Sequence, residues 1–143
     1  GSTIAQASPP SMLIPIALGL NWPARVPNAG PACDWTKAAS WTFEPLDDDA
    51  FPAVRLARLV GEASGTAPAV FNAANEVAVD AFHDGALPFT GILELVERVV
   101  SAHLDATLSE PGSAFVPAVS VSVQDVLSAE AWARAHASAL IAQ

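Results

Sequence analysis

The sequence predicts an α+β protein that is mainly α-helical. Alanine supplies 30 of the 143 residues and tyrosine is absent, a composition that favours helices packed on helices over a strand-rich fold. After residue 45, apolar residues recur with helical spacing, whereas only two short segments before it alternate. We therefore expect a short N-terminal strand and helix, an extended arm, and then a C-terminal antiparallel four-helix bundle.

The N-terminal segment predicts a strand followed by a helix. Residues 3–7 alternate weakly between polar and apolar side chains, which indicates a short strand. Ser11 is a candidate N-cap for the helix that follows. Gly19 and Pro23 end this helix. Its apolar face has i, i+3, i+4, i+7 spacing and consists of Leu13, Ile16, Ala17 and Leu20.

Residues 23–39 predict a connecting arm. They contain three prolines and a glycine and show no periodicity. An unstructured stretch of this length is uncommon inside a compact domain, so we expect the chain to cross here from one domain to another. Residues 40–44 alternate again, with Trp41 and Phe43 on one side, which predicts a second short strand.

Four helices are expected in the remainder of the chain. The first begins near Pro52, after three aspartates that favour a helix start. The second lies within residues 68–84, and the third follows Thr90. Ser122 begins a short helical turn, and Ser128 caps the last helix. Short connections between amphipathic helices are typical of an antiparallel bundle.

Charge and composition exclude several classes of function. Fifteen acidic and six basic residues give a net charge of −9, so the chain cannot build the basic face that nucleic acids or anionic membranes require. No apolar run reaches the roughly 18 residues of a membrane-spanning helix. The single cysteine, Cys33, is compatible with a cytoplasmic protein. The only methionine is Met12 and the chain opens on Gly1, so we expect it to be a piece of a longer protein.

Few residues are candidates for catalysis or metal binding, and each of them also has a structural explanation. His83, His103 and His136 lack the i, i+4 spacing of a helical metal site. His103 lies on or beside the apolar stripe of its helix, which favours a partly buried structural histidine or a surface histidine over a metal ligand. Residues 47–49 are aspartates that could hold a cation or simply form a solvated helix-capping loop. Glu94 and Glu97 could suggest a pair of catalytic carboxylates, but a charged outer face of their helix fits them better. Cys33 is a thiol with no obvious histidine partner, so we do not expect a catalytic thiolate. We therefore expect no self-sufficient catalytic site and no metal site.

Two segments carry a more specific signal. Residues 1–26 read GSTIAQASPPSMLIPIALGLNWPARV, and residues 71–82 read FNAANEVAVDAF, with FP before the second segment and LPFTGI after it. Together they resemble the C-terminal third of the 1-deoxy-D-xylulose 5-phosphate reductoisomerase family, over essentially the whole chain. The resemblance implies that residues 1–22 are the tail of a central catalytic domain, 23–46 a linking arm, and 47–143 a helical bundle domain.

The resemblance assigns a role to only a few residues of this chain. Pro10 and Met12 match family positions that border the substrate and nicotinamide, although Ser11 stands where the family usually has Asp. The alternative is that Pro10 and Met12 only begin and pack a helix. Asn72, Asn75 and Glu76 form the most recognisable block, and we assign them a structural role at a helix start and in domain packing.

The resemblance also implies an activity for the parent protein. This family uses NADPH and Mg²⁺ or Mn²⁺ to convert 1-deoxy-D-xylulose 5-phosphate into 2-C-methyl-D-erythritol 4-phosphate in non-mevalonate isoprenoid biosynthesis. We expect this chain alone to bind no cofactor, to depend on missing N-terminal and central domains, and to self-associate through residues 1–22. The alternative is a non-catalytic acidic helical interaction module, and a natural start codon just before Gly1 would favour it.

Overall fold

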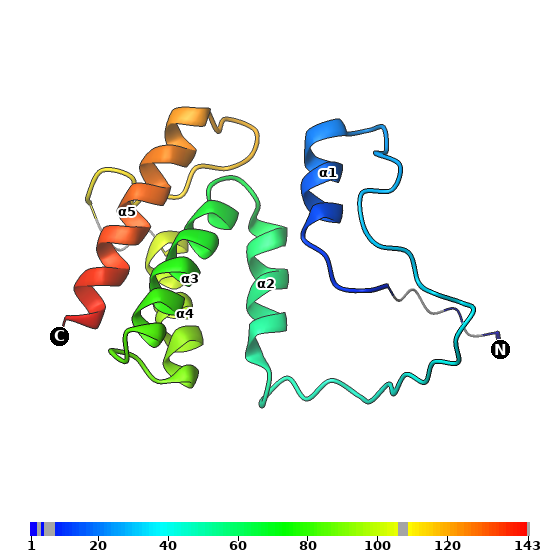
Figure 1. Cartoon of the computed structure of the whole chain (residues 1–143). Helices are drawn as coiled ribbons and strands as arrows, with labels where there is room; N and C mark the ends of the chain where they lie inside the picture. The colour runs from blue at the N-terminus through cyan, green and yellow to red at the C-terminus, as the bar shows by residue number, and fades with distance from the viewer. Residues whose placement is uncertain (3, 5–7, 106–108, 143) are drawn as a thin grey trace. The chain divides into compact units, whose positions relative to one another are not determined.

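The computed structural model describes residues 1–2, 4, 8–105 and 109–142. In these residues the chain forms five α-helices and no β-strand, so the predicted α+β class is wrong and the described fold is all-helical (Figure 1). The chain divides into two compact units, Gly1–Glu44 and Pro45–Gln143. None of these helices combines the length and the hydropathy that crossing a bilayer requires.

In its described residues the first unit contains one helix, α1 (Leu13–Asn21). The hydroxyl of Ser11 accepts a hydrogen bond from the backbone N–H of Leu13 at 3.3 Å, just before the helix begins. No residue of α1 is buried. Its exposed apolar side chains are Leu13, Ile14, Ile16, Leu18 and Leu20. A helix that is apolar on several sides and has no buried residue presents a surface suited to burial.

Neither predicted strand is observed among the described residues. Residues 40–44 are irregular, and Trp41 instead packs on the ring of Trp35, with centroids 6.1 Å apart. Of residues 3–7, only Ile4 is described, and it lies outside any strand; the rest of that prediction falls outside the described residues. A strand is stable only when a neighbouring strand accepts its backbone hydrogen bonds. Residues 40–44 have no such neighbour in the part of the chain that the structure describes.

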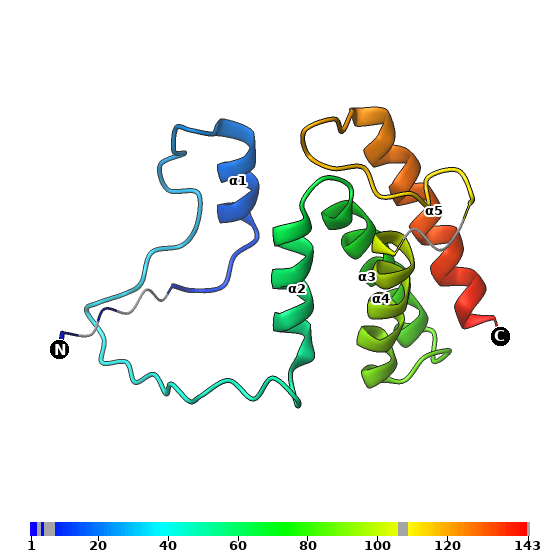
Figure 2. The same cartoon turned by 180° about the vertical axis from the view of Figure 1, so that it is seen from behind.

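The described residues of the second unit form four helices: α2 (Pro52–Ala63), α3 (Ala67–His83), α4 (Phe89–Leu104) and α5 (Val123–Ile141). The chain direction alternates from each helix to the next (Figures 1 and 2). The helix α3 is central and packs most extensively against α4 and α5. The helix α2 buries only Leu56 and Val60 and lies at the edge of the unit.

Small residues determine how closely these helices pack. The side of α3 that faces the core carries Ala73, Ala74 and Ala78, all fully buried. The side of α5 that faces the core carries buried alanines at i, i+4 and i+8, interrupted by one large residue, Trp132. The distance between packed helices depends on the side chains at the contact, so alanine brings the helices close together. Valines and leucines of α4 fill the remaining space: Leu95, Val96, Val99 and Val100.

A second prediction, about where the last helix begins, is also wrong. The expected turn at Ser122 and the expected helix after Ser128 are one continuous helix, α5, with Ser122 as its N-cap. The Ser122 hydroxyl accepts from the backbone N–H of Asp125, and the Asp125 carboxylate accepts from the backbone N–H of Ser122 at 2.9 Å. This reciprocal capping box satisfies two amides that the helix itself leaves unpaired. Ser128 lies inside the helix and accepts from Gln124.

Candidate functional site

The Asn72 and Glu76 side chains of α3 join that helix to α5. The Asn72 amide donates to Glu76 at 3.0 Å. The other oxygen of Glu76 accepts from the guanidinium of Arg134, which also bonds Glu130 one turn earlier on α5 at 2.8 Å. The hydrogen bond from Arg134 is the main reason that the pKa of Glu76 lies below its ordinary value. These groups are half exposed, so the cluster orients α3 and α5 more than it stabilises them.

The third residue of the same block, Asn75, faces elsewhere. It lines an apolar groove between the start of α2, the middle of α3 and the start of α4. Its side chain is half-buried and makes no hydrogen bond within the described part of the chain. The block predicted from the sequence therefore serves two surfaces. Two of its members hold α5, and the third is an unpaired amide in a groove.

Pro10 and Met12 lie in the first unit, immediately before α1. Pro10 is exposed, and 73% of Met12 is accessible to solvent. Within the described residues of this unit, nothing covers either side chain. Both are therefore available to another surface, and the role that the resemblance implies for them stays a prediction.

A buried polar chain runs through the second unit and centres on His103 of α4. The Nδ1 atom of His103 lies 2.7 Å from the carbonyl oxygen of Ser113, and its Nε2 atom lies 2.8 Å from the hydroxyl of Thr66. A carbonyl can only accept, so Nδ1 carries the proton, and in the neutral ring Nε2 accepts from Thr66. The Thr66 oxygen accepts in turn from the backbone N–H of Val116 at 3.0 Å.

This chain fastens the connection between α4 and α5 onto the helices. Thr66 stands just before α3, whereas Ser113 and Val116 belong to the connection, and Thr66, His103 and Ser113 are all buried. A buried polar group that lost its partner would cost about 1–3 kcal/mol, so each member requires the others. The role of His103 is structural. Its place on or beside an apolar stripe left both a partly buried and a surface position open, and no sequence signal identified Thr66 and Ser113 as its partners.

Trp132 of α5 extends the same assembly. Its ring stacks on His103 with centroids 5.5 Å apart and on His136 with centroids 5.1 Å apart. Its indole N–H donates to a carboxylate oxygen of Glu110 at 2.9 Å. The connection is thus tied both to α4 through His103 and to α5 through Trp132.

We predict that acid weakens the fold through His103. Burial lowers the pKa of His103, and the hydrogen bond to the Ser113 carbonyl offsets this only in part. Because the folded state disfavours the protonated ring, the full stability is present above the unfolded pKa of about 6.5 and decreases as pH falls from there toward the lower folded pKa. The free energy of unfolding should fall by at most about 1.4 kcal/mol per pH unit in this window.

Urea unfolding between pH 8 and pH 5 measures this effect. His103→Leu should be less stable at pH 8 but should lose most of the pH dependence. His83→Leu, at an exposed position, should keep it. If the free energy of unfolding of His103→Leu fell with pH as steeply as that of the wild type, another titrating group would be the cause.

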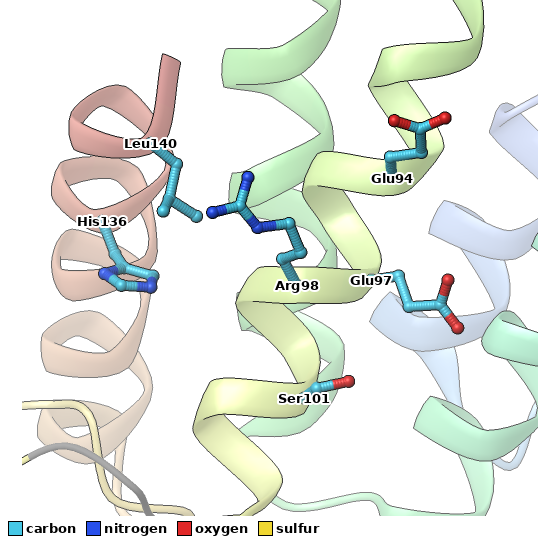
Figure 3. Close-up of a pocket in the computed structure, with 6 residues that line it drawn as sticks. All are labelled: Glu94, Glu97, Arg98, Ser101, His136 and Leu140. Atoms are coloured by element: carbon cyan, nitrogen blue, oxygen red, sulfur yellow. The ribbon is translucent and has the colours of Figure 1, made fainter. Parts of the chain in front are cut away.

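Glu94 and Glu97 do not form a carboxylate pair. They line an open hollow on α4 with Arg98 and Ser101, which α5 completes with His136 and Leu140 (Figure 3). The side chains of Glu94 and Glu97 point in different directions, and Arg98 points toward α5 (Figure 3). Glu97 instead forms an ion pair with Arg55 of α2 at 3.5 Å. Glu94 and Glu97 therefore do not act together as a pair of carboxylates.

Of the other candidates, Asp47 has a structural role. The Asp47 carboxylate accepts from the backbone N–H groups of Asp49 and Ala50 at 3.1 and 3.0 Å, so it shapes the turn before α2. Cys33 is a half-buried free thiol in the first unit. Across the described residues, no three His, Cys, Asp or Glu side chains gather as a metal site would require.

A comparison with protein-family models decides the family. Residues 7–136 match the model of the DXP reductoisomerase C-terminal domain. The chain belongs to this family. The resemblance recognised in the sequence, from residues 1–26 and 71–82, is thereby confirmed.

Curated reductoisomerases are similar to this chain along its length. The 1-deoxy-D-xylulose 5-phosphate reductoisomerase of Kitasatospora griseola is 63% identical over 142 residues, covering 99% of this chain and 34% of that protein. The reductoisomerase of Streptomyces avermitilis is 60% identical over 143 residues, covering 100% of this chain and 34% of that protein. The chain therefore spans about a third of the length of these reductoisomerases.

Solved reductoisomerase structures share the fold. The enzyme of Zymomonas mobilis in complex with NADPH matches 100% of this chain and 35% of its own, with a TM-score of 0.63 and 36% identity. A DOX-P reductoisomerase in complex with magnesium matches 99% of this chain and 34% of its own, with a TM-score of 0.62 and 29% identity. The cofactor and the metal named here belong to those complexes.

Proposed function

We propose that this chain is the C-terminal part of an NADPH-dependent 1-deoxy-D-xylulose 5-phosphate reductoisomerase, called here the parent protein. The identity of 63% over 99% of the chain to one such enzyme carries the proposal. The parent would isomerise 1-deoxy-D-xylulose 5-phosphate and reduce the product to 2-C-methyl-D-erythritol 4-phosphate, in the cytoplasm. In such chemistry a divalent metal organises the substrate oxygens and NADPH supplies hydride.

The residues of this chain fit a supporting role in that reaction. The described part gathers no ligand set for Mg²⁺ or Mn²⁺, and the sequence has no glycine-rich loop for the cofactor phosphates. Both groups would be held by the upstream domains of the parent. We propose that residues 1–22 complete the central domain, that 23–46 form the arm, and that 47–143 form the supporting bundle. Pro10 and Met12, uncovered within their own unit, would form one wall of the substrate pocket.

Expression of the complete gene tests this function. The parent should oxidise NADPH in the presence of 1-deoxy-D-xylulose 5-phosphate and Mg²⁺, followed by the loss of absorbance of the reduced nicotinamide. This chain alone should show neither activity nor saturable NADPH binding. A complete gene product without activity would overturn the proposal and favour the acidic helical interaction module. Micromolar NADPH binding by the chain alone would contradict the supporting role.

Self-association of the isolated chain is a further prediction. The α1 helix carries no charged residue and buries none of its side chains, and Leu20 is 83% exposed. Without the central domain to cover it, this surface should pair with a second copy. Sedimentation velocity should give a larger species for residues 1–143 than for residues 47–143 at equal concentration. Two monomers would show that residues 1–22 do not drive assembly.

A further inference from the structure

The groove lined by Asn75 is a mainly apolar depression of the second unit. It lies between the start of α2, α3 and the start of α4 and encloses about 550 Å³. Phe51, Phe71 and Phe89 line it together with aliphatic side chains. Phe51 is 62% exposed and Phe89 is 73% exposed. Aromatic side chains held at an open surface in this way are typical of interface anchors.

The polar groups that line the groove indicate the chemistry of the surface that would bind there. All of its charged lining residues are acidic: Asp49, Glu94 and Glu97. Arg55 forms an ion pair with Glu97, and among the described residues no basic side chain pairs with Asp49 or Glu94. Asn75 offers a donor and an acceptor without a hydrogen-bond partner in the described chain, and a side-chain amide of this kind can bond both groups of a peptide backbone. The complementary surface is a polypeptide segment with apolar side chains flanked by lysine or arginine.

We infer that this groove docks a segment of the parent protein that lies upstream of residue 1. This inference rests on the proposed function. The chain spans about a third of the matched reductoisomerases, so most of the parent's surface is available to meet the bundle. A second copy of this chain fits poorly, because its net charge of −9 would add acidic groups to an acidic rim.

Hydroxyl-radical footprinting of the parent protein tests the inference. Phe51 and Phe89 should react severalfold more slowly in the parent than in the isolated chain, because the docked segment excludes solvent. Leu127 of α5, 52% exposed and outside the groove, serves as the internal reference. Equal reactivity of the two phenylalanines in the parent and in the isolated chain would overturn the inference.

Charge reversal identifies the chemistry of the occupant. In the parent, the double variant Asp49→Lys/Glu94→Lys should shift the docking equilibrium by about two- to tenfold toward the open form, and Phe51 and Phe89 should regain reactivity. Glu62→Lys is the matched control, because Glu62 is exposed on α2 outside the groove. Unchanged protection in the double variant would show that the segment is not basic and would overturn that part of the inference.

Two further outcomes keep this inference separate from the proposed function. If the parent is an active reductoisomerase but its phenylalanines react as in the isolated chain, the docking inference fails and the function stands. If the phenylalanines are protected but the parent lacks activity, the function fails and the docking surface stands. Protection in the isolated chain that rises with concentration, together with a sedimenting dimer, would assign the groove to a second copy and overturn the inference.

Discussion

Replacing Trp132 by alanine should destabilise the second unit by about 3–5 kcal/mol, the range observed for large aromatic residues in cores. Trp132 is 5% exposed and is the one large side chain among the buried alanines of α5. Its loss removes the stacking on His103 and His136 and leaves a cavity that small neighbours cannot fill. It also removes the hydrogen bond to Glu110.

Two variants separate packing from hydrogen bonding at this position. Trp132→Phe keeps an aromatic ring but no N–H donor, so it should cost less, about 1–2 kcal/mol. Trp35→Ala, at a site 75% exposed in the first unit, should change stability by less than about 0.5 kcal/mol. Urea unfolding followed by far-UV circular dichroism measures all three, since other tryptophans would obscure fluorescence. If Trp132→Phe costs as much as Trp132→Ala, the hydrogen bond and not the packing dominates.

Helix positions could be predicted from the sequence because their causes are local. Apolar spacing of 3.6 residues, proline at a helix start and glycine after a helix end act within a few residues of each other. Pro52 begins α2, and α3 ends at His83, two residues before Gly85. The error at α5 was also local. Two serines could cap it, and the capping box with Asp125, rather than the hydroxyl alone, selects Ser122.

The absence of the expected strand at residues 40–44 and the partners of His103 could not be predicted in the same way, because both depend on residues far away in the sequence. Alternation over five residues describes a strand only if another segment pairs with it, and residues 40–44 meet none in the described chain. His103 bonds Thr66, 37 residues earlier, and Ser113, 10 residues later. The different faces taken by Asn72, Asn75 and Glu76 became clear only once the packing of α2, α4 and α5 around α3 was known.

Replacing Gly65 by alanine should destabilise the second unit by about 3 kcal/mol. Gly65 has a φ of +55° and lies where residues 116–118 cross the turn between α2 and α3. A Cβ there would clash with the Val116 carbonyl oxygen, which accepts from the backbone N–H of Thr66. The left-handed conformation costs a non-glycine residue about 1–2 kcal/mol, and displacing the Val116 backbone adds a further about 1–3 kcal/mol.

Two other glycines provide matched controls for Gly65→Ala. Gly85 also has a positive φ, +74°, but a Cβ there meets nothing within 4 Å, so Gly85→Ala should cost only the conformational part, about 1–2 kcal/mol. Gly61 lies within α2 with open space around it, so Gly61→Ala should stabilise the unit by about 1 kcal/mol. Thermal and urea unfolding should give the order Gly61→Ala, wild type, Gly85→Ala, Gly65→Ala from most to least stable. If Gly65→Ala were no worse than Gly85→Ala, the connection would move aside without cost, and the buried chain of Thr66 and His103 would not hold it in place.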